Sequence, residues 1–337
     1  MNIPEETNNM EAIPERKPVN KWYLVLTVVI AAILLYLAMR GVSWQEMVCT
    51  FRSARPEFLV ILFVCSSISI FLRGVRWGVL VSARQKVPAF TMFWAAAVGY
   101  LGNNFLPARA GEVIRTVMLG QKTGVSKSYI FATAMTERML DVVILVLIGV
   151  FSIPFIGSTP EWLGNAMRVM GIIGFAALIF LFLAPRFSGW LERMILRLPL
   201  PEKIRNMAVK LMHDFILGAG AFIHPARAGM FLLYSAILWS VDAVGVIMLS
   251  YGLNMSFNFA QAFVLLLAMG LSSAIPSTPG YVGVYQFVAV TLLPLYGITK
   301  SQALTFIIAL QAVNVVAILV WGFIGLWRLN LRRNGNS

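Results

Sequence analysis

The stretch Gly102-Asn103-Asn104-Phe105-Leu106-Pro107-Ala108-Arg109-Ala110-Gly111 interrupts a long apolar region that covers residues 90–124. A second apolar region, 259–298, is interrupted by Ile275-Pro276-Ser277-Thr278-Pro279-Gly280. Proline removes a helix donor and clashes with the preceding turn, so each region is predicted to form two half-helices. Broken backbone at membrane depth is tolerated only against protein or a water-filled cavity.

The two interruptions match one another in pattern and position. Pro107 to Gly111 and Pro276 to Gly280 both read P-x-x-x-G, and they lie 169 residues apart, which is half the chain. Matched interrupted segments in an inverted repeat indicate the central site of a transporter. We therefore predict an all-α polytopic membrane protein with two inverted-topology repeats. Each repeat has three spanning helices and a broken re-entrant hairpin, which gives about eight transmembrane segments.

The composition is typical of a membrane protein. The 337 residues are 59% hydrophobic and only 12% charged, with a mean hydropathy of +0.80, whereas soluble chains are roughly 25% charged. Apolar runs of about spanning length occur at 22–39, 58–80, 129–153, 167–185, 228–250 and 302–327. No polar stretch is long enough to fold a large catalytic domain outside the bilayer.

The domain boundaries follow from these runs. Residues 1–20 are predicted to be a disordered cytoplasmic tail, 21–157 the first repeat, 158–330 the second repeat, and 331–337 a cytoplasmic tail. The segment 186–227 is too polar to span. It is either an amphipathic helix on the cytoplasmic leaflet or a solvated linker helix.

The net charge of +13 indicates orientation and contact with anionic lipid rather than nucleic acid. With both termini in the cytoplasm, most basic residues fall on the cytoplasmic side, as the positive-inside rule requires. They are Arg16, Lys17, Lys21, Arg73, Arg76, Arg84, Lys86, Lys122, Lys127, the seven between Arg186 and Arg227, Arg328, Arg332 and Arg333. The opposite side holds Arg40, Arg52, Arg55, Arg168 and Lys300. The charge distribution thus predicts a multi-pass membrane protein with both termini in the cytoplasm.

Six ionisable residues near the first interruption are expected to pair around a cavity, because each would cost roughly 2.5–3.5 kcal/mol near mid-bilayer. The three basic and three acidic residues are Arg109, Arg115, Arg138, Glu112, Glu137 and Asp141. They either bind cargo or only pin the hairpin to its neighbour. Asp242 is either a packing partner for one of these arginines or a proton site.

Neutral polar residues are the candidates elsewhere in the site. In the second half they are Ser277, Thr278, Tyr281, Tyr285, Gln286, Gln311 and Asn314. In the first half, Asn103 and Asn104 either cap a half-helix or hydrogen-bond to a headgroup. Two cysteines and two histidines provide no metal cluster. No catalytic residue, metal or cofactor is predicted, and no enzymatic activity is expected.

Three motifs in order resemble the lysylphosphatidylglycerol synthase transmembrane-region family. They are Gly99 to Arg115, Glu137 to Asp141, and Pro276 to Tyr285. The family's pattern N-P-x-R-x-G-E is present as Leu106-Pro107-Ala108-Arg109-Ala110-Gly111-Glu112, so the resemblance assigns Arg109 and Glu112 to the site. The family usually has a charged residue after the glycines of the last motif, where this chain has Tyr285 and Gln286.

The resemblance implies lipid translocation across the cytoplasmic membrane without the aminoacyl-transfer domain of full-length synthases. We expect a phospholipid or lipid-linked molecule as substrate, anionic lipid at the cytoplasmic face, and no nucleic-acid partner. An oligomer is left open. The alternatives are an accessory protein or enzyme of lipid or glycan assembly, and a proton-coupled carrier for a small solute.

Overall fold

A computed structural model describes residues 21–106, 110–155, 161–183, 186–198, 201–273 and 279–331. Throughout these residues the regular elements are helices, and no strand occurs among them. The first six are α1 (Lys21–Met39), α2 (Trp44–Arg52), α3 (Pro56–Val81), α4 (Ala89–Phe105), α5 (Ala110–Thr123) and α6 (Lys127–Ser152). The others are α7 (Glu161–Leu183), α8 (Ser188–Arg197), α9 (Glu202–Ile223), α10 (Pro225–Gly252), α11 (Phe259–Ser272), α12 (Val284–Leu292) and α13 (Lys300–Leu331). Short 3-10 turns are η2 (Ile153–Phe155), η3 (Pro279–Tyr281) and η4 (Leu293–Tyr296).

The helices are those of a membrane protein. By length and composition, α3, α10 and residues Lys300–Leu329 of α13 can each cross a bilayer. A fourth span results if Leu26–Met39 and Trp44–Arg52, which meet at 84°, count as one broken segment. Within the part of the chain that the structure describes, this measure gives three or four spans, so the predicted number of about eight is not confirmed.

The interrupted regions form pairs of short helices, as the proline positions predict. α4 ends at Phe105 and α5 begins at Ala110, while α11 ends at Ser272 and η3 begins at Pro279. Pro107 and Pro276 lie outside the described residues. Gly280 has a φ of +73°, a left-handed conformation that glycine adopts without strain.

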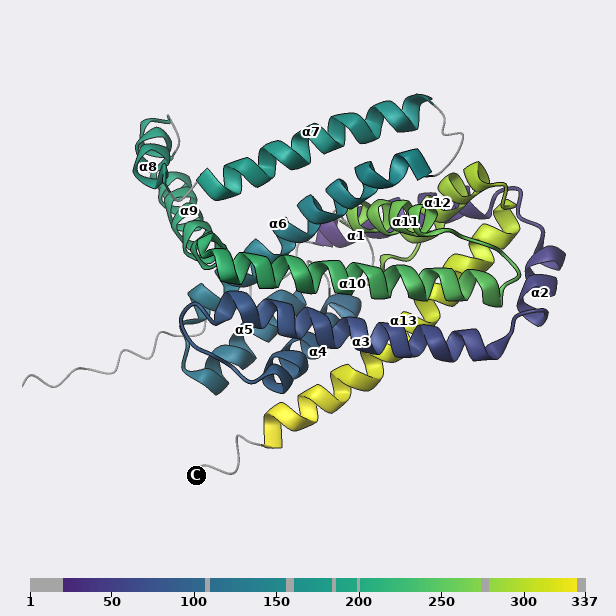
Figure 1. The fold of residues 1–337 in the computed structure, drawn as a ribbon, viewed down its shortest axis with the longest axis horizontal. Coiled ribbons are helices and arrows are strands. Elements are labelled where there is room, and N and C mark those ends of the chain that lie inside the picture. The colour runs from purple at the N-terminus through teal and green to yellow at the C-terminus, as the bar shows by residue number, and fades with distance from the viewer. Residues whose placement is uncertain are drawn as a thin grey trace, which may run out of the picture.

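The long helices α3 and α10 lie side by side and antiparallel (Figure 1). The backbone N–H of Arg55, just before α3, donates to the carbonyl of Gly252 at the end of α10, at 2.9 Å. Further along, a Cβ on Gly245 would lie 3.1 Å from the side chain of Leu62. Small residues let membrane helices approach closely, and here they bring the middle of α3 against α10.

Two other helix pairs have the same kind of contact. α13 packs on α4, where Gly325 approaches Trp94 and Val98, and α6 packs on α11, where Gly149 meets Leu267. The main hydrophobic core lies among α3, α6, α10, α11, α12 and α13. These packed helices surround the polar centre described below.

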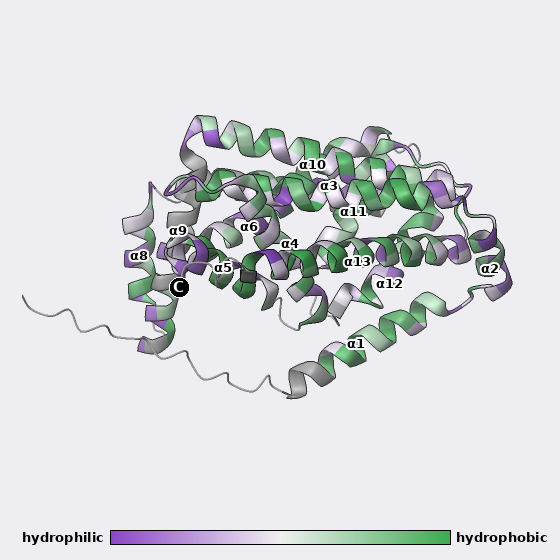
Figure 2. Cartoon of the chain, turned by 90° about the horizontal axis from the view of Figure 1, so that it is seen from below, coloured by the Kyte–Doolittle hydropathy of each residue, from purple (hydrophilic) through white to green (hydrophobic). Residues whose placement is uncertain are grey.

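Peripheral elements mark the two ends of the bundle. α2 lies at one end, while α8 and the end of α13 lie at the other (Figures 1 and 2). The segment 186–227 contains α8 and α9 rather than one helix. α8 has no buried residue, and its Trp190 and Met194 are exposed. Figure 2 shows mixed hydropathy along α8 and strongly hydrophobic α3 and α13.

Candidate functional site

The α4–α5 hairpin is closed by direct backbone contact between glycines. A Cβ on Gly102 would lie 2.7 Å from Cα of Gly111, and one on Gly111 would overlap the carbonyl oxygen of Gly99. A Cβ on Gly99 would also lie 2.8 Å from the Cδ atom of Arg115. Because these glycines have no side chain, the stem of the buried Arg115 fits between the two half-helices.

Arg76 on α3 is the centre of a buried ion-pair network. Its side chain is fully buried and donates to both carboxylate oxygens of Asp141, at 2.5 and 2.8 Å, and to Glu137 Oε1 at 3.0 Å. Glu137 and Asp141 are four residues apart on α6, so they lie on one face of the helix. Bidentate pairing of this kind suits the planar guanidinium of arginine.

The network continues into the hairpin through Arg115. Its Nη2 lies 3.1 Å from Glu137 Oε2 and 2.5 Å from Glu112 Oε2. Glu112 Oε1 accepts from Nε and Nη2 of Arg138, at 2.9 and 2.7 Å, and from the amide of Asn103 at 3.1 Å. The three carboxylates of this network are therefore all engaged by arginine.

The structure corrects one expectation about these charges. Arg73 and Arg76, which we expected in a cytoplasmic segment, lie within the candidate span α3, and Arg76 joins the buried network as a base that the predicted set did not include. Arg109 lies outside the described residues. The sequence signal for the two arginines was their i, i+3 placement at the end of an apolar run, where charges are costly.

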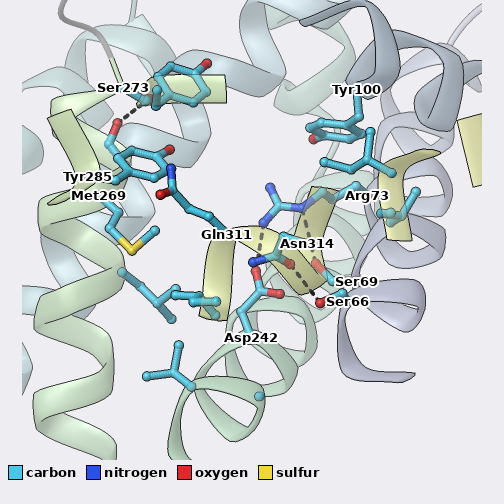
Figure 3. Close-up of a pocket in the computed structure, with 18 of the residues that line it drawn as sticks. Ser66, Ser69, Arg73, Tyr100, Asp242, Met269, Ser273, Tyr285, Gln311 and Asn314 are labelled. Carbon is cyan, nitrogen blue, oxygen red and sulfur yellow. Dashed lines mark hydrogen bonds and ion pairs between the residues drawn. The ribbon is translucent and has the colours of Figure 1, made fainter. Parts of the chain in front are cut away.

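A cavity of about 340 Å³ opens beside this network, at the polar centre of the molecule (Figure 3). Its walls come from α3, α4, α6, α10, α11, η3, α12 and α13. Leu62, Ile70, Leu145, Val246 and Leu310 give it apolar surface, and the polar side chains converge from several helices. Such a mostly apolar cavity with a few placed polar groups is typical of a ligand site.

Arg73 and Asp242 form the charged feature of the cavity wall. Arg73 Nη2 lies 2.7 Å from Asp242 Oδ2, and Arg73 Nε donates to Ser69 Oγ at 3.3 Å. Both side chains are about 15% exposed, in contrast to the fully buried Arg76. The guanidinium carbon also lies 5.7 Å from the ring centre of Tyr100 and 5.1 Å from that of Trp239. Figure 3 shows Arg73 directed into the space below Tyr100.

Another part of the cavity wall is polar but neutral. Gln286 donates to Gln311 Oε1 at 2.5 Å, and Gln311 Nε2 donates to the carbonyl of Gly280 at 3.1 Å. Tyr281 and Tyr285 stack with ring centres 5.0 Å apart. Asn314 Oδ1 accepts from the hydroxyl of Ser66 at 2.7 Å. Amide side chains fixed in this way present both donors and acceptors.

The structure brings many of the predicted site residues together around the cavity. The predicted residues that line the cavity are Asn103, Asn104, Arg138, Asp141, Tyr281, Tyr285, Gln311 and Asn314. Those that stand behind its wall are Glu112, Arg115, Glu137 and Gln286. Arg109, Ser277 and Thr278 lie outside the described residues. Sequence reasoning missed Ser66, Ser69, Arg73, Tyr100 and Trp239 as lining residues.

No group of three or more His, Cys, Asp or Glu side chains in the described ranges is arranged to hold a metal ion. The cavity's acids, Asp141 and Asp242, are instead paired with arginines. The site as described is therefore built for hydrogen bonding and charge pairing.

The chain is similar to membrane proteins of archaea. A UPF0104 membrane protein of Pyrococcus horikoshii is 24% identical over 85% of this chain and 90% of its own length. A UPF0104 membrane protein of Methanocaldococcus jannaschii is 26% identical over 66% of this chain and 91% of its own. No solved structure matches the chain.

One relative corrects the expectation that no enzyme is involved. The glycosyltransferase AglD of Haloferax volcanii is 21% identical over 91% of this chain and 54% of its own length. The prediction of a non-enzyme is contradicted by this name. It rested on missing motifs, and missing motifs do not exclude an activity that uses other side chains.

The match to a protein family covers most of the chain. Residues 24–322 match the family described as the lysylphosphatidylglycerol synthase TM region. The matched range includes both hairpins, the buried ion-pair network and the whole cavity wall. The chain therefore belongs to the lysylphosphatidylglycerol synthase transmembrane-region family.

Proposed function

We propose that this polytopic membrane protein binds the headgroup of a phospholipid or lipid-linked molecule in the central cavity and moves it across the bilayer. The observation that carries the proposal is the cavity itself, where charged and amide side chains gather among apolar helices. Ionisable residues inside membrane segments are costly and mark substrate pathways.

The size of the cavity supports a headgroup rather than a whole lipid. Its volume of about 340 Å³ is at the lower end of ligand pockets, which range from roughly 300 to 1,000 Å³. Val142 lines the cavity and is also 44% exposed on α6. The cavity is therefore not tightly closed at this point of α6, which supports a sideways opening through which acyl chains would remain in the bilayer.

Repeated spacing supports the inverted repeat. Pro225 begins α10 and Pro56 begins α3, and the two prolines are 169 residues apart, as are Gly280 and Gly111. The packing recurs as well, because α4 lies on α13 as α11 lies on α6. We propose that the two hairpins enter the membrane from opposite sides, which gives about eight segments.

The Arg73–Asp242 pair fits this symmetry. The two residues are also 169 apart, so they occupy equivalent positions of the proposed repeats and still touch. Equivalent positions meet only near the axis that relates the halves. A rocking motion of one half against the other would therefore act on this ion pair, as expected at the central site of an inverted-repeat transporter.

We also propose how the protein is oriented in the membrane. We place both termini and the α8–α9 segment on the cytoplasmic face of the inner membrane. The exposed Trp190 and Met194 of α8, set among basic residues, support contact with anionic lipid.

A translocation assay tests the proposal. Purified protein in liposomes with a fluorescent phosphatidylglycerol should let dithionite, which reaches only the outer leaflet, bleach the inner-leaflet dye as well. Arg73→Gln should reduce this rate at least tenfold, while Arg168→Gln, at an exposed position on α7, should not change it. If wild-type protein moves no more lipid than empty liposomes, the proposed function is wrong.

A double variant separates cargo binding from a purely structural ion pair. Arg73→Gln with Asp242→Asn keeps the charge balanced, so the folded state should survive while activity stays lost. If the double variant regains wild-type transport, the pair serves only to hold α3 and α10 together.

A second candidate is a step of lipid or glycan assembly within the membrane. The similarity to a protein named a glycosyltransferase favours it. Mass analysis of the lipids after the transport assay distinguishes the two, because translocation leaves the mass of the lipid unchanged and group transfer alters it.

A further inference from the structure

The two walls of the cavity differ in chemistry, and this difference bears on the headgroup. α3, α6 and α10 provide the charged side chains that line it, namely Arg73, Arg138, Asp141 and Asp242. η3, α12 and α13 provide neutral polar groups, among them Tyr281, Tyr285, Gln311 and Asn314. A ligand that touches both walls needs one charged part and one uncharged polar part.

The charged wall favours an anion over a cation. Both oxygens of Asp141 are bonded to Arg76, and Asp242 is paired with Arg73. In contrast, Nη1 of Arg73 and Nη1 of Arg138 make no hydrogen bond to the described residues, and both side chains are partly exposed. The two guanidinium groups lie on one aromatic ring, 5.7 and 5.4 Å from the centre of Tyr100. Free guanidinium donors so close together suit a phosphate group.

The neutral wall is suited to hydroxyl groups. Gln311 is held by Gln286 and by the carbonyl of Gly280, so its amide has a fixed orientation. Asn314 uses its Oδ1 to accept from Ser66, and its Nδ2 makes no hydrogen bond to the described part of the chain. Each hydroxyl of a ligand both donates and accepts, which matches a surface of amides and tyrosines. An ammonium group finds no uncommitted carboxylate on this wall.

From this juxtaposition we infer that the headgroup is a phosphate joined to an uncharged, hydroxyl-rich group, such as a sugar or cyclic polyol. The inference rests on the proposed function and names its substrate class. Arg73 and Arg138 hold the phosphate beside Tyr100. Gln311 and Asn314, next to the stacked Tyr281 and Tyr285, hydrogen-bond to the hydroxyls. The cavity has room for a headgroup but not for its acyl chains.

Competition binding with four lipids of identical dioleoyl chains tests the inference. The full-length protein in detergent is loaded with fluorescent phosphatidylglycerol, and phosphatidic acid, phosphatidylethanolamine, phosphatidylglycerol and phosphatidylinositol compete for it. Phosphatidylinositol should bind at least tenfold more tightly than phosphatidic acid, which corresponds to about two neutral hydrogen bonds. Phosphatidylethanolamine should bind no more tightly than phosphatidic acid.

Single variants test which wall of the cavity is responsible for the preference for phosphatidylinositol. Asn314→Ala leaves the Gln286–Gln311–Gly280 chain intact, and it should reduce phosphatidylinositol binding several-fold while phosphatidic acid binding stays constant. Gln311→Ala should do the same, and Arg138→Gln should weaken all four lipids. Gln121→Ala, on the exposed side of α5, is the matched control and should change nothing.

The outcomes separate the inference from the function on which it rests. Equal binding of all four lipids, or tightest binding of phosphatidylethanolamine, overturns the headgroup assignment and leaves translocation of phosphatidylglycerol standing. Absence of both binding and translocation overturns the proposed function as well.

Discussion

Arg76 is a fully buried charge that two carboxylates compensate. Its guanidinium is removed from solvent, donates hydrogen bonds to Asp141 and Glu137, and lies 5.0 Å from the ring centre of Phe231. Removing one member of such a pair leaves an uncompensated buried charge, whereas removing both members does not. The network is therefore sensitive to single neutral substitutions.

Thermal unfolding of purified variants tests this sensitivity. Arg76→Gln should destabilise the protein by about 3–5 kcal/mol, because Asp141 loses its only partner among the described residues. Arg76→Gln with Asp141→Asn should recover more than half of that loss. The exposed Arg193→Gln on α8 should stay within about 0.5 kcal/mol of wild type. A double variant as unstable as the sum of its single variants would contradict this account.

At the scale of elements, the α4–α5 hairpin depends on its glycines. The two half-helices touch through Gly102 and Gly111, and this contact places Glu112 directly after it and Arg115 one turn further along α5, opposite α6. Neighbouring backbone cannot move aside as the tip of a flexible side chain can. The hairpin geometry is thus fixed by the absence of Cβ atoms, and the charge network is built on that geometry.

A pair of glycine substitutions tests the hairpin. Gly111→Ala should cost about 3 kcal/mol or more, since the added methyl group overlaps backbone. Gly229→Ala, on α10 with nothing within 4 Å, should be neutral or stabilising by up to about 1 kcal/mol. Unfolding midpoints of the two variants provide the comparison. Equal stability of both would show that the hairpin can open without loss.

At the scale of the whole molecule, the arrangement of the bundle predicts sidedness. α2 and α8 lie at opposite ends of the long helices (Figure 1). If α3, α10 and α13 span the bilayer as proposed, these two elements are expected to face different aqueous compartments. Native Cys49 on α2 is exposed, whereas Cys65 lines the cavity.

Labelling of intact cells with a membrane-impermeant maleimide tests this topology. In a Cys65→Ser background, Cys49 should be labelled from outside. A protein with Cys49→Ser, Cys65→Ser and Arg193→Cys should be labelled only after the cells are opened. Labelling of position 193 on intact cells would reverse the proposed orientation, and labelling of both positions would place α2 and α8 on one side.

Several parts of the site could be read from the sequence because they depend on local chemistry. The half-helix breaks follow from prolines, and Glu137 and Asp141 share a helix face by their spacing. Arg73 and Arg76 could not be assigned in the same way. Their partners are 169, 61 and 65 residues away, on α10 and α6.

The sequence by itself determined that this is an all-helical membrane protein of this family, with two interrupted segments and buried charges near the first. Those properties are local, because hydropathy, proline, glycine and residue spacing can each be recognised within a single segment of the chain. Only the tertiary structure decided which charges pair, that Arg76 joins the buried network, and that Arg73 meets Asp242 at the cavity wall. The physical reason is that ion pairing depends on which helix faces turn toward one another, and that is set by close packing at distant glycines such as Gly245 and Gly111.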